Sequence, residues 1–190
     1  MSREATAQID ALAPWRAGRA IEQFCMEDLS NWYVRRSRER FWASGFGEDK
    51  RAAFEAIPLS KDVDGVSSAS LGRVILGMPA FPSCTPAGIM RLLHEYKVKL
   101  DGADAVVVGR SPILGRPMAS MLINGHATVT LCHSRTRDLP AIIGRADVLI
   151  VAMGKPRFVH GDWIKPGAVV IDAGYNEGNV GDVDFDSALP

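Results

Sequence analysis

The stretch VVVGRSPILGRPMASMLINGHATVTLCHSRT, from Val106 to Thr136, contains two short apolar runs separated by a helix-like segment. The first run stops at Gly109 and the second stops at Cys132. Between them, PMASMLINGH has a proline, Pro117, where a helix would begin and a glycine, Gly125, where it would end. Two parallel strands that are joined by a helix form a right-handed crossover unit. This stretch therefore predicts a strand, a crossover helix and a second strand parallel to the first.

Two later runs extend this pattern. The runs AVVV, ATVTLC, ADVLIVAM and AVVIDAG, between residues 105 and 174, are short, rich in β-branched residues and bounded by glycine, proline or charge. Such runs are typical of buried parallel strands. Upstream, Thr85 and Pro86 predict a helix start, followed by an apolar stripe of Ile89, Leu92, Leu93 and Tyr96. We predict an α/β fold, a Rossmann-like doubly wound parallel sheet with an N-terminal helical segment.

That N-terminal segment differs in composition from the rest of the chain. Before about residue 55 the chain is dense in arginine, glutamate and aromatic residues, and afterwards glycine, proline, valine and isoleucine dominate. Apolar residues at steps of three and four predict an amphipathic helix over residues 16–42. We therefore expect a helical segment over residues 1–55 and a Rossmann-like domain over residues 56–190, and we expect the helix to bury its apolar stripe.

Composition limits the classes of partner. The 190 residues carry 22 basic and 22 acidic side chains, so no global charge attracts nucleic acid or an anionic membrane. No stretch of eighteen apolar residues and no signal peptide is evident, so we expect a cytoplasmic protein and no membrane partner. Three cysteines without metal-ligand spacing predict buried thiols in a reducing compartment. The histidines show no metal-ligand spacing either, so we predict no metal site.

The glycine turn and the end of the second strand predict a ligand site. In doubly wound sheets the ligand binds beyond the carboxyl ends of the strands, so Gly109, Arg110 and Ser111 are candidate contacts. Alternatively, the glycines serve only a tight turn. An NAD enzyme would place an acid after the second strand, whereas this chain has the polar group His133, Ser134 and Arg135. Cations and a hydroxyl suit a 2′-phosphate, which favours NADP.

Five ordered motifs, KDVDG, CTPAGIM, VVVGRSPILGRPMA, ATVTLCHSRT and KPGAVVIDAGYN, resemble the bifunctional methylenetetrahydrofolate dehydrogenase/cyclohydrolase family. The resemblance covers about residues 57–190. It implies hydride transfer from methylene-tetrahydrofolate to NADP, hydrolysis of the methenyl product, and a homodimer. It also implies that Asp64 orients the folate and that Gly115 and Pro117 shape the helix start beside the cofactor contacts Gly109, Arg110, Ser111, His133, Ser134 and Arg135. Without the resemblance, Asp64 would be interpreted as a turn residue that caps its own backbone.

The sequence departs from that family in three ways. No tyrosine is followed four residues later by the family's catalytic lysine, because those positions hold Ser37, Leu100 and Asn179. Ser83 stands where the family usually has a proline, and the chain ends at Pro190, before a glycine-rich segment typical of the family. We therefore predict a cofactor lobe that is truncated at its C-terminus, with weak or no catalysis. The alternative is a cofactor-binding module without turnover.

Residues 15–55 resemble a helix of the anticodon-binding region of isoleucyl-tRNA synthetase, with MEDLSNWYVRRSRERFW (26–42) as its centre. This resemblance suggests a junction of two gene fragments, as in a natural fusion or a chimera. A third functional hypothesis is an RNA-contacting helix on an inert carrier. A run of arginines is usually a solvated helix face, however, so we do not expect nucleic acid as a partner.

Overall fold

The computed structural model describes residues 47–48, 52, 55 and 57–189. The chain divides into two units, Met1–Ile57 and Pro58–Pro190. The predicted N-terminal helix, residues 16–42, lies outside the described residues, and so do its run of arginines and Cys25. The sheet and its helices belong to the second unit.

A parallel four-stranded sheet forms the centre of the second unit. Its strands are β1 (Asp104–Val108), β2 (Thr128–Cys132), β3 (Val148–Val151) and β4 (Val169–Asp172). They lie in the order β2-β1-β3-β4, and all paired neighbours are parallel. Each strand falls in one of the four predicted apolar runs, although β1 begins one residue earlier. The prediction of a parallel α/β sheet is therefore confirmed.

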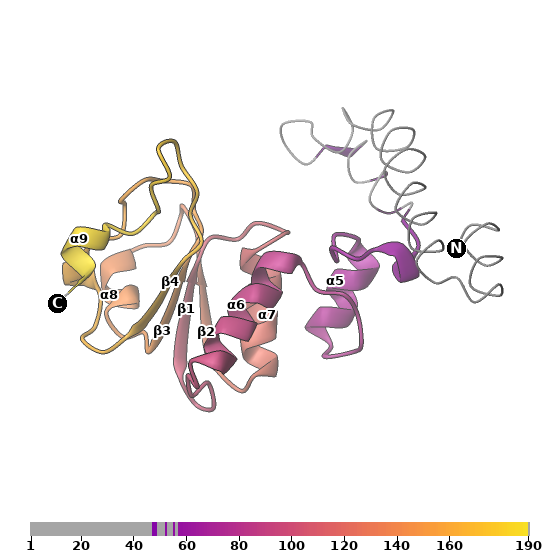
Figure 1. Ribbon diagram of the computed structural model, residues 1–190, viewed down its shortest axis with the longest axis horizontal. Coiled ribbons are helices and arrows are strands. Elements are labelled where there is room, and N and C mark those ends of the chain that lie inside the picture. Colours follow the sequence, from indigo (N-terminus) through magenta and orange to yellow (C-terminus); the bar gives the residue numbers. More distant parts are fainter. Residues whose placement is uncertain (1–46, 49–51, 53–54, 56, 190) are drawn as a thin grey trace, which may run out of the picture. The chain divides into compact units, whose positions relative to one another are not determined.

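Helices cover both faces of this sheet, as Figure 1 shows. Successive side chains of a strand point to opposite faces, so β1 contributes to two core clusters. Val107 packs in a cluster with residues of α6 (Cys84–Glu95) and α7 (Gly115–Asn124). Val106 packs in the other, with residues of α8 (Leu139–Ile143) and α9 (Phe185–Ala188). The sheet is therefore doubly wound, as predicted.

Burial differs between the central and the outer strands. All of β3 and four of the five residues of β1 are buried, whereas β2 and β4 keep exposed or half-buried residues, among them Leu131. The prediction of four buried strands is therefore right for the central pair and wrong for the outer pair. Helices cover the middle of a sheet more completely than its edges, and this coverage is not visible in the sequence of one strand.

The helix α6 begins one residue before the predicted cap. Its N-cap is Ser83 instead of Thr85, and Pro86 is its third residue instead of its first. The backbone N–H of Cys84 donates to the Asp64 carboxylate, which lies twenty residues upstream (N–O distance 3.3 Å). Pro117 is likewise the third residue of α7, and Gly125 caps that helix as predicted. Proline is tolerated at both positions because the first N–H groups of a helix have no partner within it.

Two expectations for α6 are wrong. Ile89 and Leu93 are buried, but Leu92 and Tyr96 of the predicted stripe are exposed, because the buried face follows the 86-89-93 spacing. Cys84, predicted as a buried thiol, is also exposed, whereas Cys132 is buried. The remaining elements are α5 (Ser68–Ile75) and two short 3-10 helices, η2 (Leu59–Lys61) and η3 (Gly161–Trp163). Among the described residues, no helix is long and apolar enough to span a membrane.

Candidate cofactor site

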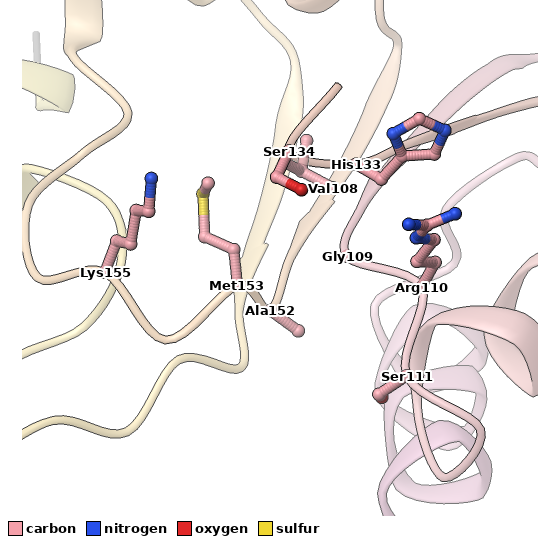
Figure 2. Close-up of a pocket in the computed structure, with 9 residues that line it drawn as sticks. All are labelled: Val108, Gly109, Arg110, Ser111, His133, Ser134, Ala152, Met153 and Lys155. Atoms are coloured by element: carbon pink, nitrogen blue, oxygen red, sulfur yellow. The ribbon is translucent and has the colours of Figure 1, made fainter. Parts of the chain in front are cut away.

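A pocket of about 250 Å³ lies at the carboxyl ends of β1, β2 and β3. Figure 2 shows its lining residues converging from three loops. They are Val108, Gly109, Arg110, Ser111, His133, Ser134, Ala152, Met153 and Lys155. Five of the eight predicted cofactor residues are among them, whereas Gly115, Pro117 and Arg135 do not line the pocket.

Gly109 and Gly115 are required by backbone packing. Gly109 has a φ of 130°, and a Cβ there would overlap the carbonyl oxygen of Ala152. A Cβ on Gly115 would overlap the carbonyl oxygen of Gly109. The turn after β1 therefore folds back on itself and contacts the loop after β3. This supports the tight-turn interpretation of both glycines, whether or not a ligand also approaches them.

Ser111 lies in the loop before α7, whose N-cap is Leu114, and satisfies the N–H groups at the start of the helix. Its hydroxyl accepts from the backbone N–H of Leu114 (3.1 Å) and from that of Gly115 (3.4 Å), and its carbonyl accepts from the N–H of Arg116 (3.1 Å). The first N–H groups of α7 are thus already satisfied. The N–H groups of Arg110, Ser111 and Ile113 donate to no acceptor within the described part of the chain. Donors for an anion are therefore offered by the loop before α7 rather than by the helix itself.

The turn after β2 is built from hydrogen bonds among four consecutive residues. The N–H of His133 donates to the Thr136 hydroxyl (2.8 Å), and the N–H of Thr136 donates to the His133 carbonyl (2.8 Å). The N–H of Arg135 donates to Nδ1 of His133 (3.1 Å). Nδ1 of His133 thus acts as the acceptor that fixes the backbone of the turn. Ser134 and Arg135, both exposed, form the tip of the turn.

Lys155 lines the pocket, although it is not among the site residues predicted from the sequence. It follows β3 in the segment MGKP, and its ammonium nitrogen lies 4.9 Å from the centre of the Phe158 ring. Arg110 and Lys155 lie on opposite sides of the pocket in Figure 2. None of the nine described lining residues is acidic, so the pocket is suited to an anionic ligand. A lysine in the loop that follows a buried strand at its carboxyl end is the sequence signal that points to Lys155.

Asp182 is the second residue missed from the sequence. Its side chain is fully buried and accepts four hydrogen bonds. The donors are the backbone N–H groups of Met153 (2.6 Å), Gly154 (2.9 Å) and Lys155 (2.8 Å) and the side-chain amide of Asn176 (2.9 Å). Burial by itself raises the pKa of Asp182, but these hydrogen bonds outweigh it and hold the pKa below its usual value. Asp182 is therefore a carboxylate at neutral pH.

Asp64 lies away from the pocket, at the start of α6. It is exposed, and its carboxylate raises the pKa of the Cys84 thiol through a hydrogen bond and its charge. The self-capping role considered for Asp64 belongs instead to Asp62, which is buried and accepts from Ser67 N–H (2.9 Å) and from the Ser67 hydroxyl (2.6 Å). Asp64 remains available to a ligand on its exposed side. In the described part of the chain, no three acidic, histidine or cysteine side chains cluster as a metal site.

Comparisons with known proteins agree with this geometry. Residues 83–190 match the model of the tetrahydrofolate dehydrogenase/cyclohydrolase NAD(P)-binding domain. The bifunctional protein FolD of Acidobacterium capsulatum is 57% identical over 141 residues, which is 74% of this chain and 50% of the relative. A FolD protein of Streptomyces avermitilis is 62% identical over 141 residues, 74% of this chain and 49% of the relative. The chain thus spans about half the length of the curated relatives it matches.

Solved structures give the same result. The dehydrogenase/cyclohydrolase of Campylobacter jejuni superposes with a TM-score of 0.71 at 45% identity, over 73% of this chain and 51% of that one. The Trypanosoma brucei enzyme, complexed with NADP and an inhibitor, has a TM-score of 0.69 and 37% identity over 74% of this chain and 52% of that one.

Other expectations are not supported by these comparisons or stay untested. The resemblance of residues 15–55 to isoleucyl-tRNA synthetase is not borne out, and nothing supports a junction of two gene fragments. The homodimer stays a prediction. The motifs first identified in the sequence, the doubly wound sheet and the matched relatives agree, and the chain belongs to the tetrahydrofolate dehydrogenase/cyclohydrolase family.

Proposed function

We propose that the pocket binds NADP and that this domain supplies the cofactor side of a methylenetetrahydrofolate dehydrogenase site. One observation carries the proposal: the pocket crosses the carboxyl ends of three strands, and none of its nine described lining residues is acidic. NAD enzymes of this fold use an acid after the second strand to hold the ribose hydroxyls. Here the corresponding turn presents Ser134 and Arg135. The NADP complex of the Trypanosoma brucei relative supports the same cofactor.

The strand order suggests how the dinucleotide lies. The pyrophosphate of a dinucleotide binds at the turn after the first strand, which here offers the N–H groups of Arg110 and Ser111, neither of which has an acceptor among the described residues. The neighbour of β1 on one side is β2 and on the other side is β3. We assign the 2′-phosphate to Ser134 and Arg135 after β2, with the Arg110 guanidinium beside it. The nicotinamide half then lies at the loop after β3, near Lys155.

The roles of the remaining residues follow from this layout. Hydride acceptance is the chemistry that the bound nicotinamide would supply. Gly115 and Pro117 shape the start of α7 without touching the ligand, and His133 fixes the turn through its Nδ1. Asp64 is proposed to orient the folate from its exposed side. Since no Tyr-x-x-x-Lys occurs in the sequence, we expect cyclohydrolase turnover at the background rate.

The decisive experiment is calorimetry of NADP and NAD binding to the full chain. The wild type should bind NADP more tightly, and Arg135→Ala should weaken NADP about tenfold while leaving NAD nearly unchanged, because one charge-assisted hydrogen bond in a solvated position is worth about 1.5 kcal/mol. Arg91→Ala is the matched control, since Arg91 is an exposed arginine that pairs with Glu95 on α6. Equal affinities for NAD and NADP in the wild type would refute the assignment.

A further inference from the structure

The loop after β3, residues 152–155, forms one wall of the pocket and is held from a distant part of the chain. The three N–H groups of residues 153–155 all donate to the carboxylate of Asp182, which lies 27 to 29 residues away in sequence. Successive N–H groups that converge on one anion fix several backbone torsions at once. The conformation of this wall is therefore set by a single side chain that does not itself line the pocket.

Asp182 is in turn held by Asp172, the last residue of β4. One oxygen of Asp172 accepts from the N–H of Asp182 (3.1 Å) and the other from the N–H of Val183 (2.9 Å). A parallel bridge between Val159 and Val183 ties the same segment to the chain beyond the pocket wall. The carboxyl end of β4 is thereby connected through two carboxylates to the loop after β3.

The surroundings of these two carboxylates leave them little freedom. A Cβ on Gly174 would overlap the carboxyl group of Asp182, and a Cβ on Gly181 would overlap that of Asp172. Two glycines are thus needed where the backbone approaches the acids. The arrangement suits a carboxylate, because the four groups that hydrogen-bond to the Asp182 oxygens are all donors.

We infer that Asp182 is a positioning residue for the nicotinamide half of the cofactor, acting through the backbone of residues 153–155. This inference rests on the proposed function, because the nicotinamide half is assigned to the β3 side of the pocket. In the pocket, the hydrogen bonds of Asp182 reach only the loop after β3, which touches the turn after β1 at Ala152. The turns after β1 and β2 have hydrogen bonds of their own. Loss of the Asp182 charge should therefore weaken binding of the nicotinamide half of the dinucleotide and leave binding of the adenosine half unchanged.

The test compares two ligands on the full chain. NADP should use the whole pocket, whereas adenosine 2′,5′-bisphosphate should reach only the sides formed by β1 and β2. Asp182→Asn should weaken NADP about tenfold or more, since small misplacement of a binding wall is costly, and should change the affinity for the bisphosphate by less than about twofold. The change in NADPH fluorescence on binding, which reports the nicotinamide environment, should also decrease.

A matched control is available at the other end of the strands, away from the pocket. Asp147 accepts from the N–H of Asp104 (2.9 Å) and pairs with Lys165, so it also joins strands, but it lies at their amino ends. Asp147→Asn should leave the ratio of the two affinities unchanged, even if it lowers stability. If Asp182→Asn does not fold, Asn176→Ala replaces it as the test. That variant removes one of the four donors and should weaken NADP alone, by about threefold.

The outcomes are distinguishable. An equal loss of both ligands, or no loss of NADP in the variant that folds, would overturn the role of Asp182 while the wild type still binds NADP. If the wild type binds neither ligand, the proposed function fails and this inference fails with it.

Discussion

The two sides of the pocket are built in different ways. The turn after β2 is closed by hydrogen bonds between residues no more than three positions apart, from His133 to Thr136. The loop after β3 is closed by Asp182, which lies 27 to 29 residues away. The turn after β2 is stabilised by its own residues. The loop after β3 takes its conformation only when β4 and the segment with Asp182 have folded against it. Substitution of Asp182 should therefore alter the loop after β3 and leave the turn after β2 unchanged.

We expect the greatest loss of stability at the contact between the turn after β1 and the loop after β3. Gly109→Ala would add a Cβ that overlaps the Ala152 carbonyl oxygen at a φ of 130°, so unfolding free energy should fall by about 3 kcal/mol or more. Urea denaturation measures this. Gly154→Ala is the matched control: its φ is 67° with open space around it, and backbone strain alone should cost about 1 kcal/mol. Equal losses would mean that the contact with Ala152 is unimportant.

Asp182→Asn is expected to have the next largest effect on stability. It leaves buried N–H groups without a charged acceptor, and we expect a loss of about 2 kcal/mol at pH 7. The pKa of Asp182 is lowered in the folded protein, so its contribution is complete above the unfolded value of about 3.9 and is lost as pH falls through the folded pKa. The difference between wild type and variant should therefore shrink in acid. A constant difference from pH 7 to pH 2, measured by urea denaturation, would contradict this.

A smaller effect is expected from the local turn. Thr136→Val keeps the shape of the side chain and removes the hydroxyl that accepts from His133 N–H, so stability should fall by about 1 kcal/mol. NADP binding should weaken because the tip with Ser134 and Arg135 loosens, while the NADPH fluorescence change on binding should persist. A loss of that fluorescence change would show that the two sides are coupled.

The smallest effect should be a gain. The Ser83 hydroxyl is buried and has no hydrogen-bond partner among the described residues. Ser83→Ala removes this unpaired group and should stabilise the protein by about 0.5 kcal/mol without changing the affinity for either ligand. Thermal unfolding would detect the rise in melting temperature. Ser67→Ala is a control that should lower the melting temperature. Ser67 donates its hydroxyl to Asp62, and its loss should destabilise. Destabilisation by Ser83→Ala would mean that this hydroxyl has a partner.

Sequence reasoning located most of the fold because the relevant signals are local. The four strands and α7 are visible as apolar runs bounded by proline and glycine. The start of α6 was misplaced because its first N–H is satisfied by Asp64, a residue that no local cap rule would include. The exposure of Leu92 and Tyr96 was missed for a related reason, since the helix stripe depends on which neighbour covers it.

For the candidate site, the residues that lie directly after β1 and β2 could be predicted from the sequence, because the carboxyl ends of parallel strands lie at the same end of the sheet. The sequence also shows that residues 133–136 contain no acid, which is the basis of the prediction of NADP. Three features depend on the folded arrangement: the contact of Gly109 with Ala152, the place of Lys155 across the pocket from Arg110, and the hydrogen bonds from Asp182 to the loop after β3. These contacts join residues that are distant in the chain, and burial of a carboxylate among N–H donors leaves no periodic pattern in the sequence.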